Sequence, residues 1–219
     1  MFFLDYPVTP ELDIVFAINT AASDADNTFK LLKDAVKSIV DKYSPDKIRY
    51  SVIVFGDSQT SVVSFTKDPQ DVKKLIRSVD RMPLPSGLPD LKELLEKAKD
   101  VFRNDSGRPQ TNKVLVVLTD SESPTTSTDI KEASKVLWKD EITVIGVAVG
   151  PKANLRKLEK MTPDKRSPLN ASKDMDPNDL GDKIMKEVLE GWYTANRISC
   201  FREKAFPSLE AFIFNAKEI

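Results

Sequence analysis

The sequence predicts an α/β fold: a doubly wound, mostly parallel six-stranded sheet with one antiparallel edge strand and helices on both faces. Residues 12–18, 113–120 and 142–150 are rich in Val, Ile and Leu, as strands buried on both faces are. Stretches with apolar residues at helical spacing separate these runs along the chain. Alternating strands and helices are typical of a parallel sheet that is covered by helices.

The central strand is predicted over 12–18, and the sequence turns small and polar directly after it. Asp24, Asp26 and Asn27 offer N-caps for the helix that follows. The helix is indicated by apolar residues at helical spacing, namely Phe29, Leu32, Val36, Ile39, Val40 and Tyr43. Ligands of open α/β sheets bind where such a strand meets its loop, so residues 19–23 are the first place to expect binding.

The next two strands are predicted over 48–55 and 61–65. Their connection is too short for a crossover helix, so they should pair as an antiparallel hairpin with the second strand at an edge. The remaining expected elements follow in order: helices from Asp68-Pro69, over 91–102 and over 128–138, a polar segment over 103–112, a short helix around Leu158, a weak strand or loop near 167–169, and a helix from Asp176-Pro177.

Composition limits the class of partner. The 219 residues, 40% hydrophobic, suit one good-sized core with an appendage, and 33 basic against 34 acidic residues give a net charge of −1. No long block of one sign is present, so we expect neither nucleic acid binding nor membrane insertion. The single cysteine, Cys200, excludes an intrachain disulfide, and the N-terminus lacks a signal-peptide layout.

The chain contains no histidine. Ser-His-Asp and Cys-His catalysis, the common zinc sites and imidazole acid–base chemistry all need one. The seven glycines do not have the spacing of a phosphate-binding loop or a dinucleotide fingerprint. We therefore expect no enzyme; the remaining enzymatic alternative is metal-dependent chemistry by Asp120, Glu122 and Asp57 around a bound ion.

Four segments carry a family resemblance. In order they are 12–16, followed by Phe29, then 50–55, 114–123 and 142–150. Together they resemble the von Willebrand factor A domain family over residues 11–194. The resemblance implies a doubly wound, Rossmann-like sheet and a metal-ion-dependent adhesion site (MIDAS) at the carboxyl end of the central strand. In the family, that site holds a divalent cation that bridges to an acidic residue of a partner protein.

The metal-site pattern of the family is degenerate in this chain. The family motif Asp-x-Ser-x-Ser corresponds here to Asn19, Ala21 and Ser23, and the aspartate of the third loop corresponds to Asp120. Asn19 keeps an oxygen but lacks a charge, and Ala21 donates nothing.

The threonine of the family's second loop aligns with Leu88 or Pro89, neither of which has a side-chain oxygen. Mg²⁺ requires hard oxygen donors in a near-octahedral array. We therefore expect no cofactor, with binding of Mg²⁺ or another divalent cation weak at most, at vestigial positions Asn19, Ser23 and Asp120.

Several loop tips should leave the same edge of the sheet, where ligands bind in open α/β folds. The alternative is that these loop tips are only solvated turns and that Asp120 caps the turn after its own strand. As partner-binding residues we predict Thr20, Asp24, Asp57, Ser86, Asp90, Ser121 and Glu122. Asn104 and Asn170 match the N-glycosylation pattern.

The chain is divided into an N-terminal arm over 1–10, the A-type domain over 11–194 and a C-terminal extension over 195–219. The extension is rich in aromatic residues. It either folds back over an apolar groove or docks onto a neighbouring module or a second copy, giving self-association. Cys200 would be a buried thiol in the first case or an intermolecular bridge in the second.

These observations favour a non-enzymatic protein-interaction module of the adhesion or extracellular-matrix type, secreted, and recognising its protein partner through loop tips. The main alternative is an intracellular A-domain that acts as a scaffold in a larger complex. The lone cysteine favours that alternative, because oxidised extracellular modules often carry paired cysteines.

Overall fold

The protein is described here by a computed structural model. It describes residues 11–19, 25–43, 47–56, 60–67, 69–85, 87–88, 90–105, 108, 111–162 and 167–195. The predicted arm over 1–10, Cys200 and all of the predicted extension beyond residue 195 lie outside these described residues.

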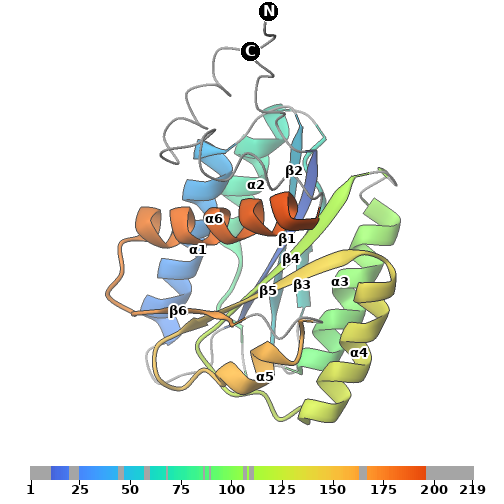
Figure 1. Cartoon of the computed structure of the whole chain (residues 1–219). Helices are drawn as coiled ribbons and strands as arrows, with labels where there is room; N and C mark the ends of the chain where they lie inside the picture. The colour runs from blue at the N-terminus through green and yellow to red at the C-terminus, as the bar shows by residue number, and fades with distance from the viewer. Residues whose placement is uncertain are drawn as a thin grey trace, which may run out of the picture.

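Six strands and six helices make up the described part of the chain (Figure 1). The strands are β1 (Leu12–Asn19), β2 (Ile48–Phe55), β3 (Thr60–Val63), β4 (Asn112–Thr119), β5 (Ile142–Val149) and β6 (Leu169–Ala171). The helices are α1 (Ala25–Lys42), α2 (Pro69–Arg81), α3 (Leu91–Asp105), α4 (Ser127–Lys139), α5 (Leu155–Glu159) and α6 (Pro177–Ala195).

The strands form one sheet in the order β3-β2-β1-β4-β5-β6. All neighbouring strands are parallel except β3, which pairs antiparallel with β2 at one edge. In the centre of the sheet, Leu12 of β1 lies opposite Ile48 of β2 and Asn112 of β4. The predicted doubly wound sheet with one antiparallel edge strand is confirmed.

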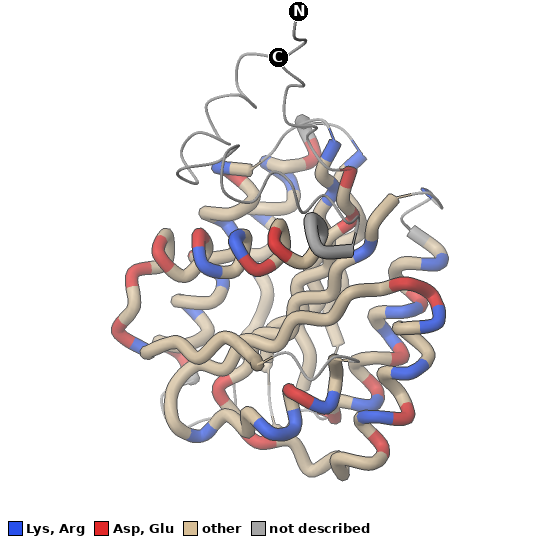
Figure 2. The backbone as a smooth tube through the Cα atoms, viewed as in Figure 1, with Lys and Arg blue, Asp and Glu red and all other residues tan. Residues whose placement is uncertain are grey.

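Helices cover both faces of the sheet, as the packing of β1 shows. Leu12, Ile14, Phe16 and Ile18 pack into one core with residues of α1, α2 and α6. Val15 and Ala17 point to the other face and pack with residues of α3, α4 and α5. Because successive side chains of a strand point to opposite faces, a strand covered on both sides is apolar at most of its positions. Figure 2 shows the result: charged residues lie mostly along the helices and connections.

The structure corrects three predicted boundaries. Strand β3 ends at Val63 and not at residue 65, because Phe65 turns into the core, where its ring lies 5.8 Å from that of Phe102. Helix α3 continues to Asp105, into the segment over 103–112 that the sequence predicted to be a polar connection. The weak strand or loop near 167–169 is strand β6, which pairs with β5 from Leu169 opposite Val147.

One carboxylate is buried at the amino end of β1. Asp13 is fully buried, and Arg108 donates to its Oδ1 from Nε at 3.0 Å and also from Nη2. The guanidinium group further donates to the backbone oxygens of Leu12 at 2.8 Å and Lys47 at 3.2 Å. Burial raises the pKa of Asp13, and the hydrogen bonds and charge of Arg108 oppose that rise.

Within the described ranges, no helix has both the length and the apolar character needed to cross a membrane.

Candidate functional site

A buried polar cluster lies at the carboxyl ends of β1 and β4. Asn19, the last residue of β1, is fully buried. Its Nδ2 donates to the carbonyl oxygen of Phe55, the last residue of β2, at 2.5 Å. Its Oδ1 accepts from the hydroxyl group of Ser121 at 3.0 Å. Only the amide nitrogen can donate to a carbonyl, so the carboxamide has one orientation and joins β1, β2 and the loop after β4.

The loop after β4 folds back on the end of its own strand. The backbone N–H of Ser121 donates to Oγ1 of Thr119 at 3.2 Å, and the hydroxyl groups of the two residues lie 3.2 Å apart. Asp120, between them, is fully buried. The polar side chains of Asn19 and of the three consecutive residues 119–121 are all buried.

Asp90 caps helix α3 and also holds the β4–α4 loop. Its Oδ1 accepts from the backbone N–H groups of Lys92 at 2.9 Å and Glu93 at 3.2 Å, as an N-cap carboxylate does. The same oxygen accepts from the hydroxyl group of Thr125 at 3.0 Å. Thr125 in turn accepts from the backbone N–H of Leu91 at 3.0 Å. A residue predicted to bind a partner thus also has a structural role.

Glu122 joins the loops that follow β4 and β5. Its side chain is 63% exposed, and its Oε1 accepts from the amide of Asn154 at 3.1 Å and lies 3.6 Å from Nζ of Lys157. Lys157 also donates to the backbone oxygen of Ser123. Asn154 is the N-cap of α5, where its side chain accepts from the N–H of Lys157 at 3.1 Å. A lysine of the chain therefore supplies positive charge next to this loop.

The described donors do not fit Mg²⁺. No group of three or more His, Cys, Asp or Glu side chains that could hold a metal occurs among the described residues. Asp120 is the one carboxylate of the buried cluster, and the oxygen of Asn19 already accepts from Ser121. Leu88, with half of its surface exposed, offers no oxygen. One carboxylate and one neutral amide are a poor set for a small divalent ion.

The structure brings part of the predicted site together. Asn19, Asp120 and Ser121 form the buried cluster, with Glu122 and Asp90 on the surface beside it. Asn104 on α3 and Asn170 on β6 are both exposed. The other predicted positions lie outside the described residues: Thr20, Ala21, Ser23, Asp24, Asp57, Ser86 and Pro89.

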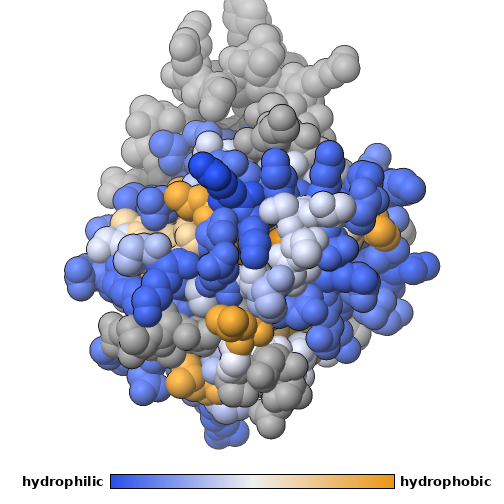
Figure 3. All heavy atoms as spheres, turned by 90° about the horizontal axis from the view of Figure 1, so that it is seen from below, coloured by the Kyte–Doolittle hydropathy of each residue, from blue (hydrophilic) through white to orange (hydrophobic). Residues whose placement is uncertain are grey.

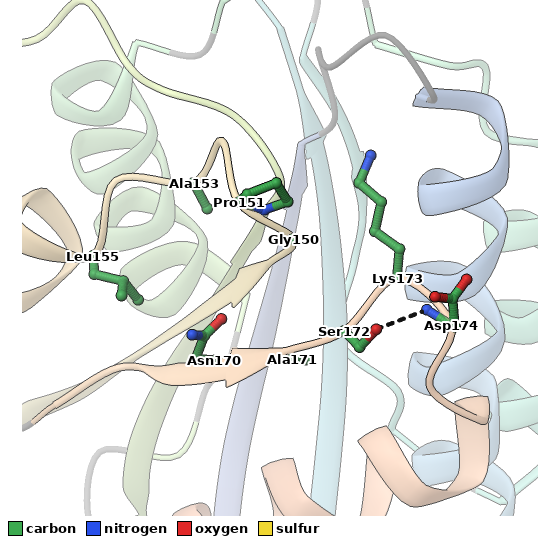
Figure 4. A pocket seen from close by; sticks show the side chains of 9 residues that line it. All are labelled: Gly150, Pro151, Ala153, Leu155, Asn170, Ala171, Ser172, Lys173 and Asp174. Carbon is green, nitrogen blue, oxygen red and sulfur yellow. Dashed lines mark hydrogen bonds between the residues drawn. The ribbon is translucent and has the colours of Figure 1, made fainter.

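Sequence reasoning missed the lysines of this edge and a hollow beside it. The hollow has a volume of about 690 Å³ and lies at the carboxyl ends of β5 and β6 (Figure 4). It is formed by the loop after β5 and by β6 with the loop that follows, and its lining residues are Gly150, Pro151, Ala153, Leu155, Asn170, Ala171, Ser172, Lys173 and Asp174. The pairing of β6 with β5 places these two segments together, and β6 is only three residues long, so the sequence pattern gave no signal for it.

An open, doubly wound sheet with a loop cluster at the carboxyl ends of β1 and β4 defines the class of α/β domains that bind ligands at this edge. The sequence profile of the von Willebrand factor type A domain matches residues 13–186. The chain belongs to this family, whose members are generally non-enzymatic modules for protein interaction.

Solved structures share the fold. Proximal thread matrix protein 1 from the mussel byssus, with a zinc-occupied MIDAS motif, is similar with a TM-score of 0.63 and 23% identity over 82% of this chain and 45% of that chain. A von Willebrand factor type A protein from Catenulispora acidiphila gives a TM-score of 0.65 and 17% identity over 82% of this chain and 42% of that chain. The chain thus spans less than half of the length of either structure.

A third similar structure is a single domain. The SpRpn10 VWA domain has a TM-score of 0.61 and 14% identity, over 80% of this chain and 95% of that chain. At these identities the similarity establishes the fold alone. What one of these proteins binds says nothing about what this chain binds.

Proposed function

We propose that this domain is a non-enzymatic interaction module that binds a protein partner through the loops at the carboxyl end of its sheet, without a divalent cation. The observation that carries the proposal is the hydrogen bonding of Asn19, whose amide nitrogen and oxygen are both engaged within the protein. A neutral side chain that links β1, β2 and the loop after β4 stands where the family motif begins with a carboxylate.

The physical reason is the charge balance of a buried site. Removing a carboxylate from water is costly unless a cation compensates it. In a metal-containing A domain the bound ion is that cation. Asn19 needs none, because its amide is neutral and both of its polar ends have partners. With Asn19 neutral, Asp120 is the one carboxylate left in the cluster, and a single carboxylate gives an affinity for Mg²⁺ that is weak at most.

The surface above this cluster has the character of a protein-binding surface. Seen from below, where the loops after β4 and β5 lie, the molecule is largely hydrophilic with small hydrophobic spots (Figure 3). Leu88, which is 50% exposed, lies on the loop before α3, and Leu155, which is 37% exposed, is the first residue of α5; the charged Glu122 lies on the loop after β4. Apolar anchors within a polar surround are typical of non-obligate interfaces.

We further propose that the partner belongs to an extracellular, matrix-type assembly. The similarity to a matrix protein of the mussel byssus supports this, as does the exposure of the glycosylation candidate Asn104. An intracellular scaffold is the second candidate, and the single cysteine of the chain supports it. Mass spectrometry after glycosidase treatment, applied to protein purified from its natural source, distinguishes the two candidates. A glycan on Asn104 would favour the extracellular assembly over the intracellular scaffold.

The proposal is tested by capture of partners on the immobilised full chain, with and without EDTA. We expect one specific protein to be retained equally in both buffers and to be lost from Leu88→Glu. The matched control is Val136→Glu, since Val136 on α4 is 39% exposed and lies on a helix flank. Capture that EDTA abolishes would overturn metal independence, and equal capture by both variants would overturn the choice of surface.

A further inference from the structure

The outer side of strand β3 is an open edge of the sheet. Among the described strands, β3 is the terminal one and pairs with β2 alone. Val63 packs on the face that α2 covers, whereas Val62 points to the opposite face and is 36% exposed. Thr60 and Ser64 are exposed as well. An edge strand of this kind can present unpaired N–H and C=O groups to another strand.

The hydrogen bonds of β2 show which of its residues face β3. The carbonyl oxygen of Phe55 points toward β1, where Nδ2 of Asn19 donates to it. The backbone of Tyr50 points the other way: its oxygen accepts from the N–H of Thr66 at 2.9 Å, and its N–H donates to Oγ1 of Thr66 at 3.0 Å. Because alternate residues of a strand direct their backbone groups to opposite sides, positions 50, 52 and 54 face β3.

The same alternation identifies the outward-facing groups of β3. Val63 and Ser61 lie opposite positions 52 and 54, so these two residues bond to β2. The hydroxyl group of Ser51 also donates to the oxygen of Val63, at 2.6 Å. Thr60 and Val62 therefore direct their N–H and C=O groups away from the sheet. Within the described ranges, nothing pairs with these groups.

Strand β3 has few of the features that keep sheet edges apart. Thr60–Val63 contains no proline and no charged side chain, in a chain of which 31% of the residues are charged. Lysine, proline and bulges are the usual protection of an edge strand, and short length is another. With its four residues, β3 has only the last of these. A strand that pairs with it should therefore bind weakly.

The exposed positions of this edge form a symmetric pattern. In order they are Thr60, Val62 and Ser64, that is a hydroxyl group, an isopropyl group and a hydroxyl group. A two-fold axis at Val62 would place Val62 opposite Val62 of a second copy and Thr60 opposite Ser64 of that copy. The valines then form an apolar cross-strand pair, the hydroxyl groups can hydrogen-bond, and no like charges meet. The edge is thus complementary to itself.

We propose that two copies of this chain pair antiparallel through β3, with the two-fold axis at Val62, and form one continuous sheet. Val62 exchanges both of its backbone hydrogen bonds with Val62 of the second copy. A two-fold dimer uses the edge of each copy once and is therefore closed. The proposal goes beyond the proposed function and does not depend on it, since a dimer can form whether or not the loops bind a partner.

Sedimentation equilibrium of the full chain tests the pairing. We expect a reversible monomer–dimer equilibrium with a Kd on the order of 100 µM, because so short an edge buries less surface than a stable dimer needs. Val62→Lys and Val62→Glu should each weaken the dimer about tenfold, since like charges meet at the axis. An equimolar mixture of the two variants should restore it, because Lys then faces Glu. Val136→Lys, at a position of α4 that is 39% exposed, is the matched control and should change nothing.

Amide hydrogen exchange, followed by NMR, tests the geometry in the wild-type chain. The N–H of Val62 faces outward in the monomer, so its protection should rise with protein concentration. The N–H groups of Ser61 and Val63 bond to β2 and should be protected at every concentration. If either charged variant fails to fold, this experiment decides by itself.

Four results would overturn the proposal. They are a wild-type chain that stays monomeric up to about ten times the expected Kd, a dimer that Val62→Lys leaves intact, a mixture of folded variants that associates no better than each alone, and a Val62 amide whose exchange does not depend on concentration. A dimer formed through another surface would give the second and the fourth of these results. Capture of a partner by Leu88→Glu tests the proposed function separately.

Discussion

The two ends of strand β1 bury polar side chains in different ways. At the amino end, the carboxylate of Asp13 is fully buried and is compensated by the guanidinium group of Arg108. At the carboxyl end, Asn19 is equally buried but neutral, and a carbonyl and a hydroxyl group satisfy its amide. At Asp13 the chain keeps a buried carboxylate beside a cation, and at Asn19 it has a neutral amide where the family motif has a carboxylate, which leaves Asp120 as the one carboxylate of the carboxyl-end cluster.

The largest expected effect comes from removing the cation at the amino end. Arg108→Met leaves the carboxylate of Asp13 buried without compensation, and should lower the free energy of unfolding by about 4 kcal/mol at pH 7. Urea denaturation measures the loss. The double variant Asp13→Asn/Arg108→Met should recover part of it, because no charge remains to be buried. Equal stability of the single and double variants would contradict the role given to the ion pair.

The pH dependence of the same variant sharpens the comparison. The pKa of Asp13 is already raised above 3.8 by burial, so between 3.8 and the folded-state pKa the folded protein binds more protons than the unfolded chain. Stability contributed by this group therefore falls as the pH rises through that window. Loss of Arg108 raises the pKa further, so the deficit of Arg108→Met should shrink as the pH is lowered. A deficit that is constant between pH 7 and pH 5 would contradict this.

A charge introduced at the other end should be the next most costly change. Asn19→Asp replaces the donor to the Phe55 carbonyl by a carboxylate oxygen and buries an uncompensated charge, at a cost of about 3 kcal/mol at pH 7. Asn19→Ala is the matched control, because it removes both hydrogen bonds without adding charge. Denaturation should show that Asn19→Asp regains stability on acidification and that Asn19→Ala does not.

A smaller loss is expected from Ser121→Ala. It removes the hydroxyl group that donates to Asn19 Oδ1 and should cost about 1 kcal/mol. Ser127→Ala, on an exposed position of the first turn of α4, should change stability by less. Thermal unfolding of the two variants separates them. Equal melting temperatures would mean that the Asn19 crosslink does not depend on Ser121.

The smallest expected effect lies on the surface of α1. Burial of Asp34 opposes its ionisation, but hydrogen bonds from Lys37 and Lys30 outweigh it and lower the pKa of Asp34. Its contribution is present above pH 3.8 and is lost as the pH falls through the folded-state pKa. Asp34→Asn should therefore cost about 0.5 kcal/mol at pH 7 and nothing in strong acid. A cost as large as that of Arg108→Met would erase the contrast between buried and exposed pairs.

The long strands could be predicted closely from the sequence. The predicted bounds of β2 match the observed Ile48–Phe55, and those of β1 differ by one residue, because both strands are predominantly apolar and are flanked by polar residues or glycine. β6 has only three residues, of which Ala171 is the buried one, so its pattern is too short to distinguish from a loop. Its pairing with β5 decides its conformation.

The location of the site could be predicted from the topology of the sheet, but the contacts of its side chains could not. The carboxyl ends of parallel strands meet at one edge, so Asn19 and Asp120 could be placed together. The partners of Asn19 could not, since they depend on the orientation of one amide. The partner of Asp13 was also missed. An aspartate inside a buried strand indicates that a cation lies nearby, but Arg108 lies in a segment without hydrophobic periodicity, so its position could not be predicted.

The central claim is that a neutral crosslink at Asn19 replaces the metal of the family, and a metal titration tests it most directly. The melting temperatures of the wild-type chain and of Asn19→Asp/Ala21→Ser would be followed against Mg²⁺ and Mn²⁺ concentration. The account predicts no saturable rise for the wild-type chain and a saturable, EDTA-reversible rise for the variant. A saturable, EDTA-reversible rise in the wild-type chain would contradict it.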